Sequence, residues 1–146
     1  MKDCKCSYCG NEEALSVFGE FVCELTNSNL YIFKEQSHKG RVIVAYKEHV
    51  DDFTDLSDEE RNGFFADVNL VSKALKALYN PTKVNYGMYN DKGHHLHCHL
   101  VPKYENDEFE FGSTFEMNPK RTYFSEAEFE NLKNEIKNEV NRMLSK

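Results

Sequence analysis

The chain has 146 residues, 40% of them hydrophobic, which suits a single domain over residues 1–146 with a buried core. Its formal net charge of −7 disfavours a surface for nucleic acids or anionic membranes, because those partners attract clusters of Lys and Arg. No stretch approaches the roughly 20 apolar residues of a membrane span, and the first residues lack the apolar run of a signal peptide, so we expect a cytoplasmic protein.

The first motif is a Cys-x-x-Cys turn formed by Cys6 and Cys9 and followed by Gly10. Five cysteines cannot all pair within one chain, and this spacing lets two thiolates approach one tetrahedral zinc ion. The sequence has no second Cys-x-x-Cys, so the other ligands would be distant histidines. A redox dithiol or two unremarkable thiols are the alternatives, and Cys4 is a rival ligand within the candidate metal element at 4–10.

Three short strands are predicted in the first half of the chain, at 15–23, 29–33 and 41–46. His49 stands just beyond the third strand, in the sequence Lys-Glu-His. A lone histidine there is usually a solvated loop residue, but Cys6 and Cys9 offer it partners at a metal site.

Two helices begin at capping boxes, in which Ser is followed three residues later by Glu. The first opens at Ser57 and is predicted to end at Asn80, before a proline, with Asp67 on its solvated face. Its predicted buried stripe is Phe64, Phe65, Val68, Val71, Leu75 and Leu78. The second helix, 125–144, has an inward face of Phe129, Leu132, Ile136, Val140 and Met143. Both helices are expected to pack against a sheet.

Between the helices, a strand at 83–88 and a turn at 89–94 lead into a histidine strand at 95–101. Strand side chains alternate between faces, so His95, His97 and His99 share one face while Leu96, Cys98 and Leu100 share the other. Pro102 is expected to end the strand, because proline lacks a donor for the sheet. The two strands are predicted to pair antiparallel, which would put Asn85 beside the histidine face.

These residues alone allow two chemical interpretations of the histidine face. Two of the rings could join Cys6 and Cys9 as zinc ligands, or an imidazole could act as a nucleophile or general acid–base, because histidine titrates near neutral pH. The two are compatible, since a closed set of two cysteines and two histidines is structural and leaves other imidazoles for a reaction.

The pattern His, apolar, His, apolar, His, apolar, apolar over residues 95–101 resembles the signature of the histidine triad (HIT) nucleotide hydrolases and transferases. The resemblance extends to Asn85-Tyr86-Gly87 and to residues 40–49, and it covers roughly residues 6 to 104. It implies an α+β fold, with an antiparallel sheet of about five strands flanked by two main helices, and commonly a homodimer.

The resemblance also implies roles for single residues. In zinc-bearing members of the family, the positions matching Cys6, Cys9, His49 and His95 hold a structural zinc ion. His97 would attack the α-phosphorus of a nucleotide and form a nucleotidyl-histidine intermediate, while His99 would hydrogen-bond a phosphate oxygen. Asn85 would donate to phosphate, and Glu35 is a loose counterpart of the acidic residue that contacts the ribose.

The turn before the histidine strand departs from the family pattern. Family members commonly carry a Gly-rich turn with Gln and Ser or Thr there, whereas this chain has Asn90-Asp91-Lys92-Gly93-His94, one residue shorter. Asn90 or Lys92 would replace the missing phosphate donor. Asp91 is expected to point to solvent, because a carboxylate repels phosphate, and His94 is read as a turn residue.

The sequence therefore predicts a nucleotidyl hydrolase or transferase that acts on a dinucleoside polyphosphate or a nucleoside phosphoramidate. One alternative is a nucleotide-binding module with little or no turnover, suggested by the altered turn. Another is a zinc-stabilised interaction domain, which leaves His97 and His99 unexplained. No nucleic-acid or membrane partner is expected.

Overall fold

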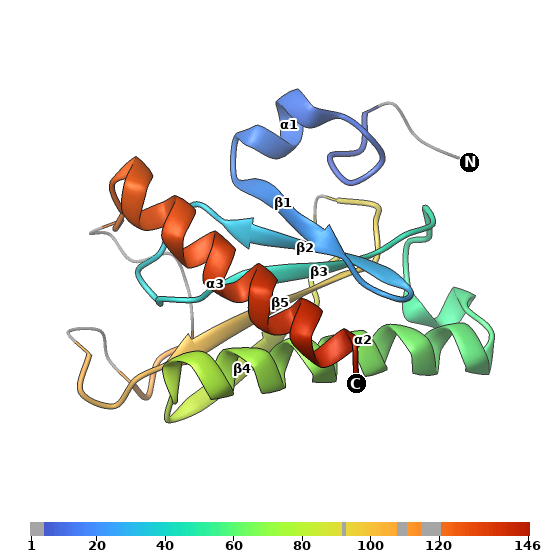
Figure 1. Ribbon diagram of the computed structural model, residues 1–146. Coiled ribbons are helices and arrows are strands. Elements are labelled where there is room, and N and C mark those ends of the chain that lie inside the picture. The colour runs from blue at the N-terminus through green and yellow to red at the C-terminus, as the bar shows by residue number, and fades with distance from the viewer. Residues whose placement is uncertain (1–4, 92, 108–110, 115–120) are drawn as a thin grey trace.

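The computed structural model describes residues 5–91, 93–107, 111–114 and 121–146 (Figure 1). Its centre is an antiparallel sheet with the strand order β1-β2-β3-β5-β4. The strands are β1 (Gly19–Glu24), β2 (Ser28–Phe33), β3 (Val42–Tyr46), β4 (Lys83–Gly87) and β5 (His97–Lys103). The predicted five-stranded α+β architecture is confirmed.

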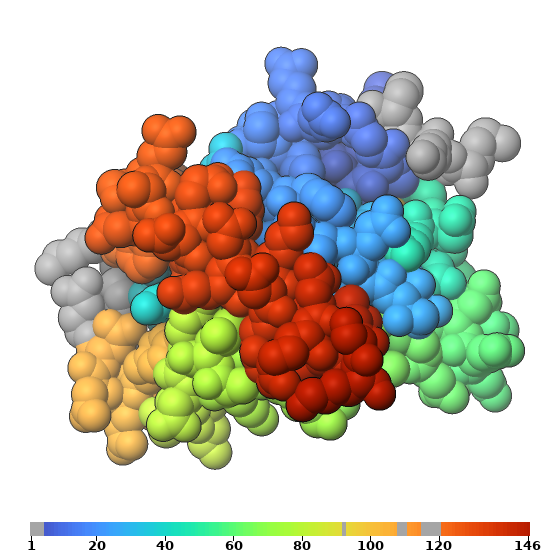
Figure 2. Space-filling model, viewed as in Figure 1, coloured from blue at the N-terminus to red at the C-terminus, as the bar shows by residue number. Residues whose placement is uncertain are grey.

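The two long helices cover one face of this sheet. A short 3-10 helix (Phe53–Asp55) leads from β3 into α2 (Asp58–Tyr79), which crosses over to β4, so that β5 inserts between β3 and β4. The C-terminal α3 (Glu126–Leu144) packs against α2 and β1 and runs in front of the sheet in Figure 1. Together α2 and α3 form much of the surface seen from this side (Figure 2).

The helix boundaries follow from their caps. Ser57 and Ser125 each accept a hydrogen bond from the backbone of the Glu three residues later, and that Glu side chain bonds back to the cap backbone. Asn80 ends α2 in the left-handed conformation with φ of 45°, which Asn tolerates better than most residues. Both predicted capping boxes are confirmed.

The two faces of β5 pack against different groups. Leu96, Cys98 and Leu100 belong to the main core beneath α2 and α3, and each is at most 2% exposed. Burying a side chain the size of Leu contributes about 1.5–3 kcal/mol, so this face anchors the strand. The opposite face carries the histidines and a smaller cluster, namely Tyr31, Phe33, Ile43 and Ala45, which Tyr8, Leu15 and Phe18 partly cover.

The structure corrects the predicted strand at 15–23. Residues Glu12–Ser16 form the short helix α1, which Asn11 caps by accepting from the backbone of Ala14, and β1 begins only at Gly19. Leu15 therefore reaches the smaller cluster from a helix. Two apolar residues between acidic ones and Ser do not distinguish one helical turn from a strand end.

The predicted solvated position of Asp67 on α2 is wrong, because its side chain is only 3% exposed. The turn between β1 and β2 docks on α2, and the backbone N–H of Asn27 donates to Asp67 at 2.7 Å. A Cβ at Gly63 would lie 2.7 Å from the side chain of Asn27, so a glycine permits this close approach. Conversely, Phe65 of the predicted buried stripe is 39% exposed and packs beside Phe53.

Pro102 lies within β5 and does not end it. The carbonyl of Leu96 accepts a hydrogen bond from the backbone of Tyr46 in β3. Backbone groups of residues an even number of positions apart in a strand point to the same side, so the nitrogen of Pro102 also faces the β3 side. The pairing with β3 ends at Leu100, so the missing N–H of proline breaks no sheet hydrogen bond.

Among the described residues, none of the helices combines the length and the apolar character that crossing a membrane requires.

Candidate functional site: a metal cluster beside a histidine pocket

Four side chains from distant segments meet at the N-terminal end of the histidine strand. Cys6 and Cys9 approach His49 and His95, and the four ligand atoms all lie within 4.8 Å of one another. The structure thus brings together the four residues that the sequence selected as metal ligands. Cys4, the rival ligand, lies outside the described residues.

Four of the six distances among these atoms match a tetrahedral zinc site. Zinc bonds of about 2.3 Å to sulfur and about 2.0–2.1 Å to nitrogen imply tetrahedral edges of about 3.3 Å between nitrogens and about 3.6 Å between sulfur and nitrogen. The two Nδ1 atoms of His49 and His95 are 3.3 Å apart, and the sulfur–nitrogen distances are 3.2 Å from Cys9 to His49, 3.5 Å from Cys9 to His95 and 3.4 Å from Cys6 to His95. The donor set therefore fits zinc.

The ring nitrogen of His95 that points away from the thiols has the hydrogen-bond partner typical of a metal-binding histidine. Its Nε2 donates to the backbone carbonyl of Tyr46 at 2.7 Å, which leaves Nδ1 unprotonated and directed at the thiols. Burial raises the pKa of the Cys6 thiol, and a bound cation would favour the thiolate instead.

The second part of the site is a cavity of about 490 Å³ on the same face of β5, hereafter the histidine pocket. The described lining residues are Ser7, Tyr8, Phe18, Phe33, Tyr89, Asp91, Gly93, His97 and His99. Tyr8 connects the two parts, because its ring centroid lies 5.2 Å from that of His95 and 5.4 Å from that of His97. A lining that combines aromatic rings with imidazoles suits a flat ring joined to a charged group.

His97 presents an unprotonated nitrogen to the pocket. Its Nδ1 donates to the carbonyl of His95 at 2.7 Å, and since a carbonyl can only accept, the lone pair is on Nε2. Burial lowers the pKa of His97 from its ordinary value, so the ring is neutral at physiological pH. A neutral imidazole with a free Nε2 is the form that acts as a nucleophile.

His99 is the neighbour of His97, with ring centroids 5.4 Å apart. The guanidinium of Arg41, which the sequence did not single out for chemistry, places Nη2 at 3.3 Å from Nδ1 of His99. Burial, the charge of Arg41 and the nearby His97 lower the pKa of His99 to about 3. A single Arg at the start of a strand carries no spacing pattern, so only the structure identifies it.

Of the two predicted substrate-binding asparagines, Asn85 lies on the histidine face and Asn90 does not line the pocket. Asn85 pairs with Val101 in the sheet, on the histidine face and next to the pair that Gly87 makes with His99. Asn90 is exposed and donates from its amide to Asp52 at 3.2 Å, away from the described lining.

Glu35 is buried and turned toward the backbone. Its carboxylate accepts from the backbone N–H groups of Ser37 and Thr122, at 2.9 and 3.0 Å. These bonds hold the loop between β2 and β3, and Glu35 is not among the described lining residues of the histidine pocket. A ribose contact by Glu35 stays a prediction.

The turn before β5 borders the pocket. Asp91 is exposed, as expected, yet it also contributes to the described lining, together with Gly93. His94 is an exposed turn residue whose Nδ1 lies 3.2 Å from the carboxylate of Asp51. Lys92, the other predicted donor, lies outside the described residues.

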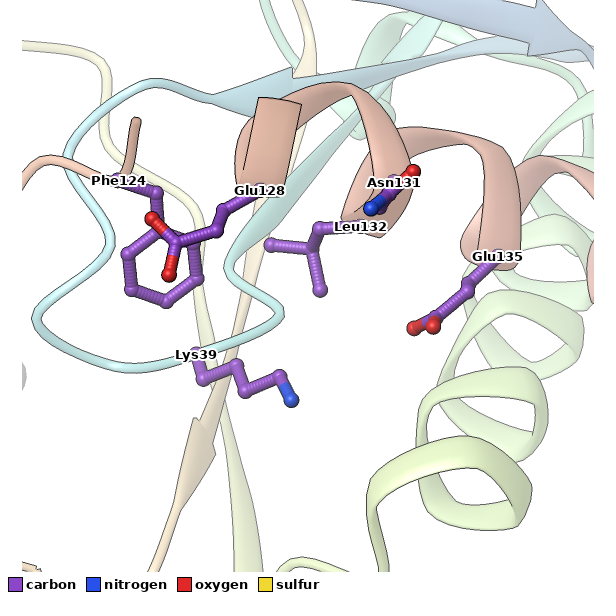
Figure 3. A pocket seen from close by; sticks show the side chains of 6 residues that line it. All are labelled: Lys39, Phe124, Glu128, Asn131, Leu132 and Glu135. Carbon is purple, nitrogen blue, oxygen red and sulfur yellow. The ribbon is translucent and has the colours of Figure 1, made fainter. Parts of the chain in front are cut away.

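A second hollow of about 270 Å³ lies between α3 and the β2–β3 loop (Figure 3). Glu128 belongs to the cap of α3, Glu135 accepts from the hydroxyl of Tyr79, and Lys39 lies over the ring of Tyr79. Its charged side chains thus hold the fold together, on the sheet face opposite the histidines.

The comparisons with known proteins agree with this geometry. A family model described as the HIT domain matches residues 22–106, more than half of the chain, and the chain therefore belongs to the HIT family. An uncharacterized HIT-like protein of Methanocaldococcus jannaschii is 31% identical over 74 residues, which cover 48% of this chain and 57% of that protein. The match thus spans little more than half of that relative.

Solved structures share the fold at low identity. A histidine triad protein from Bradyrhizobium japonicum superposes with a TM-score of 0.79 at 15% identity, covering 87% of this chain and 94% of the other. A zinc-bound histidine triad family protein from Mycobacterium smegmatis gives 0.67 at 19% identity, covering 97% and 96%. A diadenosine triphosphate hydrolase from Plasmodium falciparum gives 0.63 at 18% identity, covering 86% and 83%.

Proposed function

We propose that this protein is a nucleotidyl hydrolase or transferase that cleaves a nucleotide conjugate at its α-phosphate. The observation that carries the proposal is the unprotonated Nε2 of His97 in an aromatic-walled pocket, with His99 beside it. Support also comes from membership of the HIT family and from the fold shared with a diadenosine triphosphate hydrolase. The substrate class is a dinucleoside polyphosphate or a nucleoside phosphoramidate.

The chemistry would proceed in two displacements at phosphorus. In the first, the lone pair of His97 Nε2 forms a bond to the α-phosphorus, and the bond to the leaving group breaks with its electron pair departing on that group. In the second, a water oxygen attacks the phosphorus, the nitrogen–phosphorus bond returns its electrons to Nε2, and the water loses a proton to solvent. The product is a nucleoside monophosphate. A second acceptor in place of water would make the reaction a transfer.

Other residues would stabilise the charge that spreads over the phosphate oxygens. His99 would donate a hydrogen bond to one of these oxygens, and Asn85, on the same face of the sheet, would donate another. Tyr8, Phe18 and Phe33 would stack against the base.

We also propose that Cys6, Cys9, His49 and His95 hold a structural zinc ion. Support comes from the tetrahedral spacing of their ligand atoms and from the zinc-bound relative. Four protein ligands leave no open position for water, so the ion would join the N-terminal segment to the histidine strand and take no part in the reaction.

One observation favours a second candidate, a nucleotide-binding module without turnover. The acidic residue Asp91 lines the pocket, while the amide of Asn90 bonds to Asp52. Tight nucleotide binding by calorimetry, with neither product nor covalent intermediate, would support this candidate.

The test compares His97→Ala with His94→Ala, which removes an exposed imidazole outside the pocket. With adenosine phosphoramidate and a diadenosine polyphosphate as substrates, we expect His97→Ala to lower the rate of nucleoside monophosphate release at least about 1,000-fold, because it removes the nucleophile. His94→Ala should keep the rate of the unmodified protein. Equal turnover by the two variants would contradict the proposal.

A further inference from the structure

A buried cation lies directly behind the histidine pocket of this acidic chain. Arg41 is 6% exposed, and the centre of its guanidinium lies 4.0 Å from the ring centroid of Phe33. None of the described residues that line the histidine pocket is a Lys or an Arg. Among the described residues, the positive charge in contact with His99 therefore comes from a side chain outside the lining.

The register of the sheet explains why Arg41 reaches His99. Arg41 directly precedes Val42, which pairs with Leu100, and Ile43 pairs with His99. Side chains alternate, so Arg41 and His99 lie on the same face in diagonal positions on neighbouring strands. Its Nη2 lies 3.3 Å from Nδ1 of His99.

This contact determines where the proton of His99 lies. A guanidinium has only donors, so Nδ1 of His99 must accept, and the single proton of the neutral ring is then on Nε2. The opposite tautomer would direct an N–H group at the guanidinium and repel it. His97 is held the other way, with its proton on Nδ1 by the carbonyl of His95.

Arg41 keeps its charge in this position. Burial lowers the pKa of Arg41 to about 10, and the carboxylate of Glu35 works against that decrease. A buried guanidinium whose Nη2 lies 3.3 Å from Nδ1 of His99 fits a role in orienting that imidazole.

We propose that Arg41 is a positioning residue of the reaction, which holds His99 as the neutral tautomer with its proton on Nε2 and so makes it a hydrogen-bond donor to the phosphate. This role rests on the proposed function. It divides the two pocket histidines by tautomer, with a lone pair on Nε2 of His97 for attack and a proton on Nε2 of His99 for charge stabilisation. Arg41 itself acts through His99 and also directs a positive potential at the site where the anion would bind.

The experiment locates the ring protons by nitrogen-15 NMR on the full, zinc-loaded chain without nucleotide. In the unmodified protein, Nδ1 of His99 should be an unprotonated acceptor and Nε2 protonated, with His97 showing the opposite pattern as an internal reference. Arg41→Met should give His99 a mixture of tautomers. Arg41→Lys keeps a charged donor at this position and should retain the protonated Nε2. Arg142→Met, which removes an exposed arginine of α3, is the matched control and should leave both histidines unchanged.

The kinetic arm uses the same variants. Arg41→Met should lower kcat at least about tenfold with a smaller change in KM, approaching the roughly 100- to 1,000-fold that losing a preorganised donor costs. A proton on Nδ1 of His99 in the unmodified protein would overturn the inference, and so would an unchanged tautomer in Arg41→Met. If Arg41→Met does not fold, the unmodified protein and Arg41→Lys still decide the tautomer. Absent turnover with the expected tautomers would refute the proposed function and leave the assignment of Arg41 to His99 intact.

Discussion

The cluster of Cys6, Cys9, His49 and His95 and the histidine pocket both use imidazoles of the histidine strand, but the rings are oriented differently in the two places. At the cluster, Nδ1 of His95 and Nδ1 of His49 converge with two sulfurs on one point. In the pocket, Nδ1 of His97 bonds to a carbonyl and Nδ1 of His99 to a guanidinium, and the lone pair of His97 is on Nε2. Under the proposed function, the partner of Nδ1, more than the ring itself, separates a metal-binding imidazole from a reactive one.

Removing one side chain from the four-residue cluster tests whether the cluster binds zinc. His49→Ala should lower zinc affinity more than about 100-fold, because loss of even an outer partner of a ligand costs about 10- to 100-fold. Elemental analysis after purification without chelators would measure the zinc content, and thermal unfolding would show the accompanying loss of stability.

Two variants serve as controls for the cluster. His94→Ala removes an exposed imidazole near the cluster, and His97→Ala removes one from the pocket; both should keep one zinc ion per chain. Zinc retained by His49→Ala would show that the four-residue cluster is not the metal site. Zinc lost from His97→Ala would show that the cluster and the pocket are not separate.

A smaller effect is expected in the histidine pocket, where His99 makes the stability of the protein depend on pH. Burial, the charge of Arg41 and the proximity of His97 lower the pKa of His99 from 6.5 to about 3, and Tyr89 also contacts its ring. Between those values the folded state binds fewer protons than the unfolded state, so this contribution to stability is present above about pH 6.5 and is lost as the pH falls toward 3.

His99→Gln should therefore reduce the slope of unfolding free energy against pH in that window, by up to about 1.4 kcal/mol per pH unit for one proton. Denaturant unfolding at a series of pH values measures this slope, with His94→Gln as the matched control. An NMR titration of the unmodified protein should show His99 neutral down to at least pH 5. A slope that does not differ between the two variants would contradict the burial of His99 as a neutral ring.

Features of the fold and the site that follow from local sequence patterns could be predicted from the sequence. Strict alternation predicts the two faces of β5, and a capping box predicts the start of each long helix, because both are local patterns with a fixed period. The family resemblance placed His49 with Cys6 and Cys9, which the structure brings together.

Features that depend on tertiary contacts were missed or misjudged. Asp67 was placed on a solvated face, and only the docking of the β1–β2 turn on α2 buries it. The contact between Arg41 and His99 joins residues 58 positions apart and leaves no trace in local spacing. Pro102 was expected to end β5, yet the end of β3 removes the partner that its missing N–H would have needed.

The most direct test of the account is to trap the covalent intermediate. The unmodified protein would be mixed briefly with an adenosine phosphoramidate, quenched and digested at alkaline pH to preserve the acid-labile bond, and mapped by mass spectrometry. The account predicts a nucleoside monophosphate adduct on His97, with none on His95 or His99. Turnover with the adduct on another residue, or with no adduct at any quench time, would contradict it.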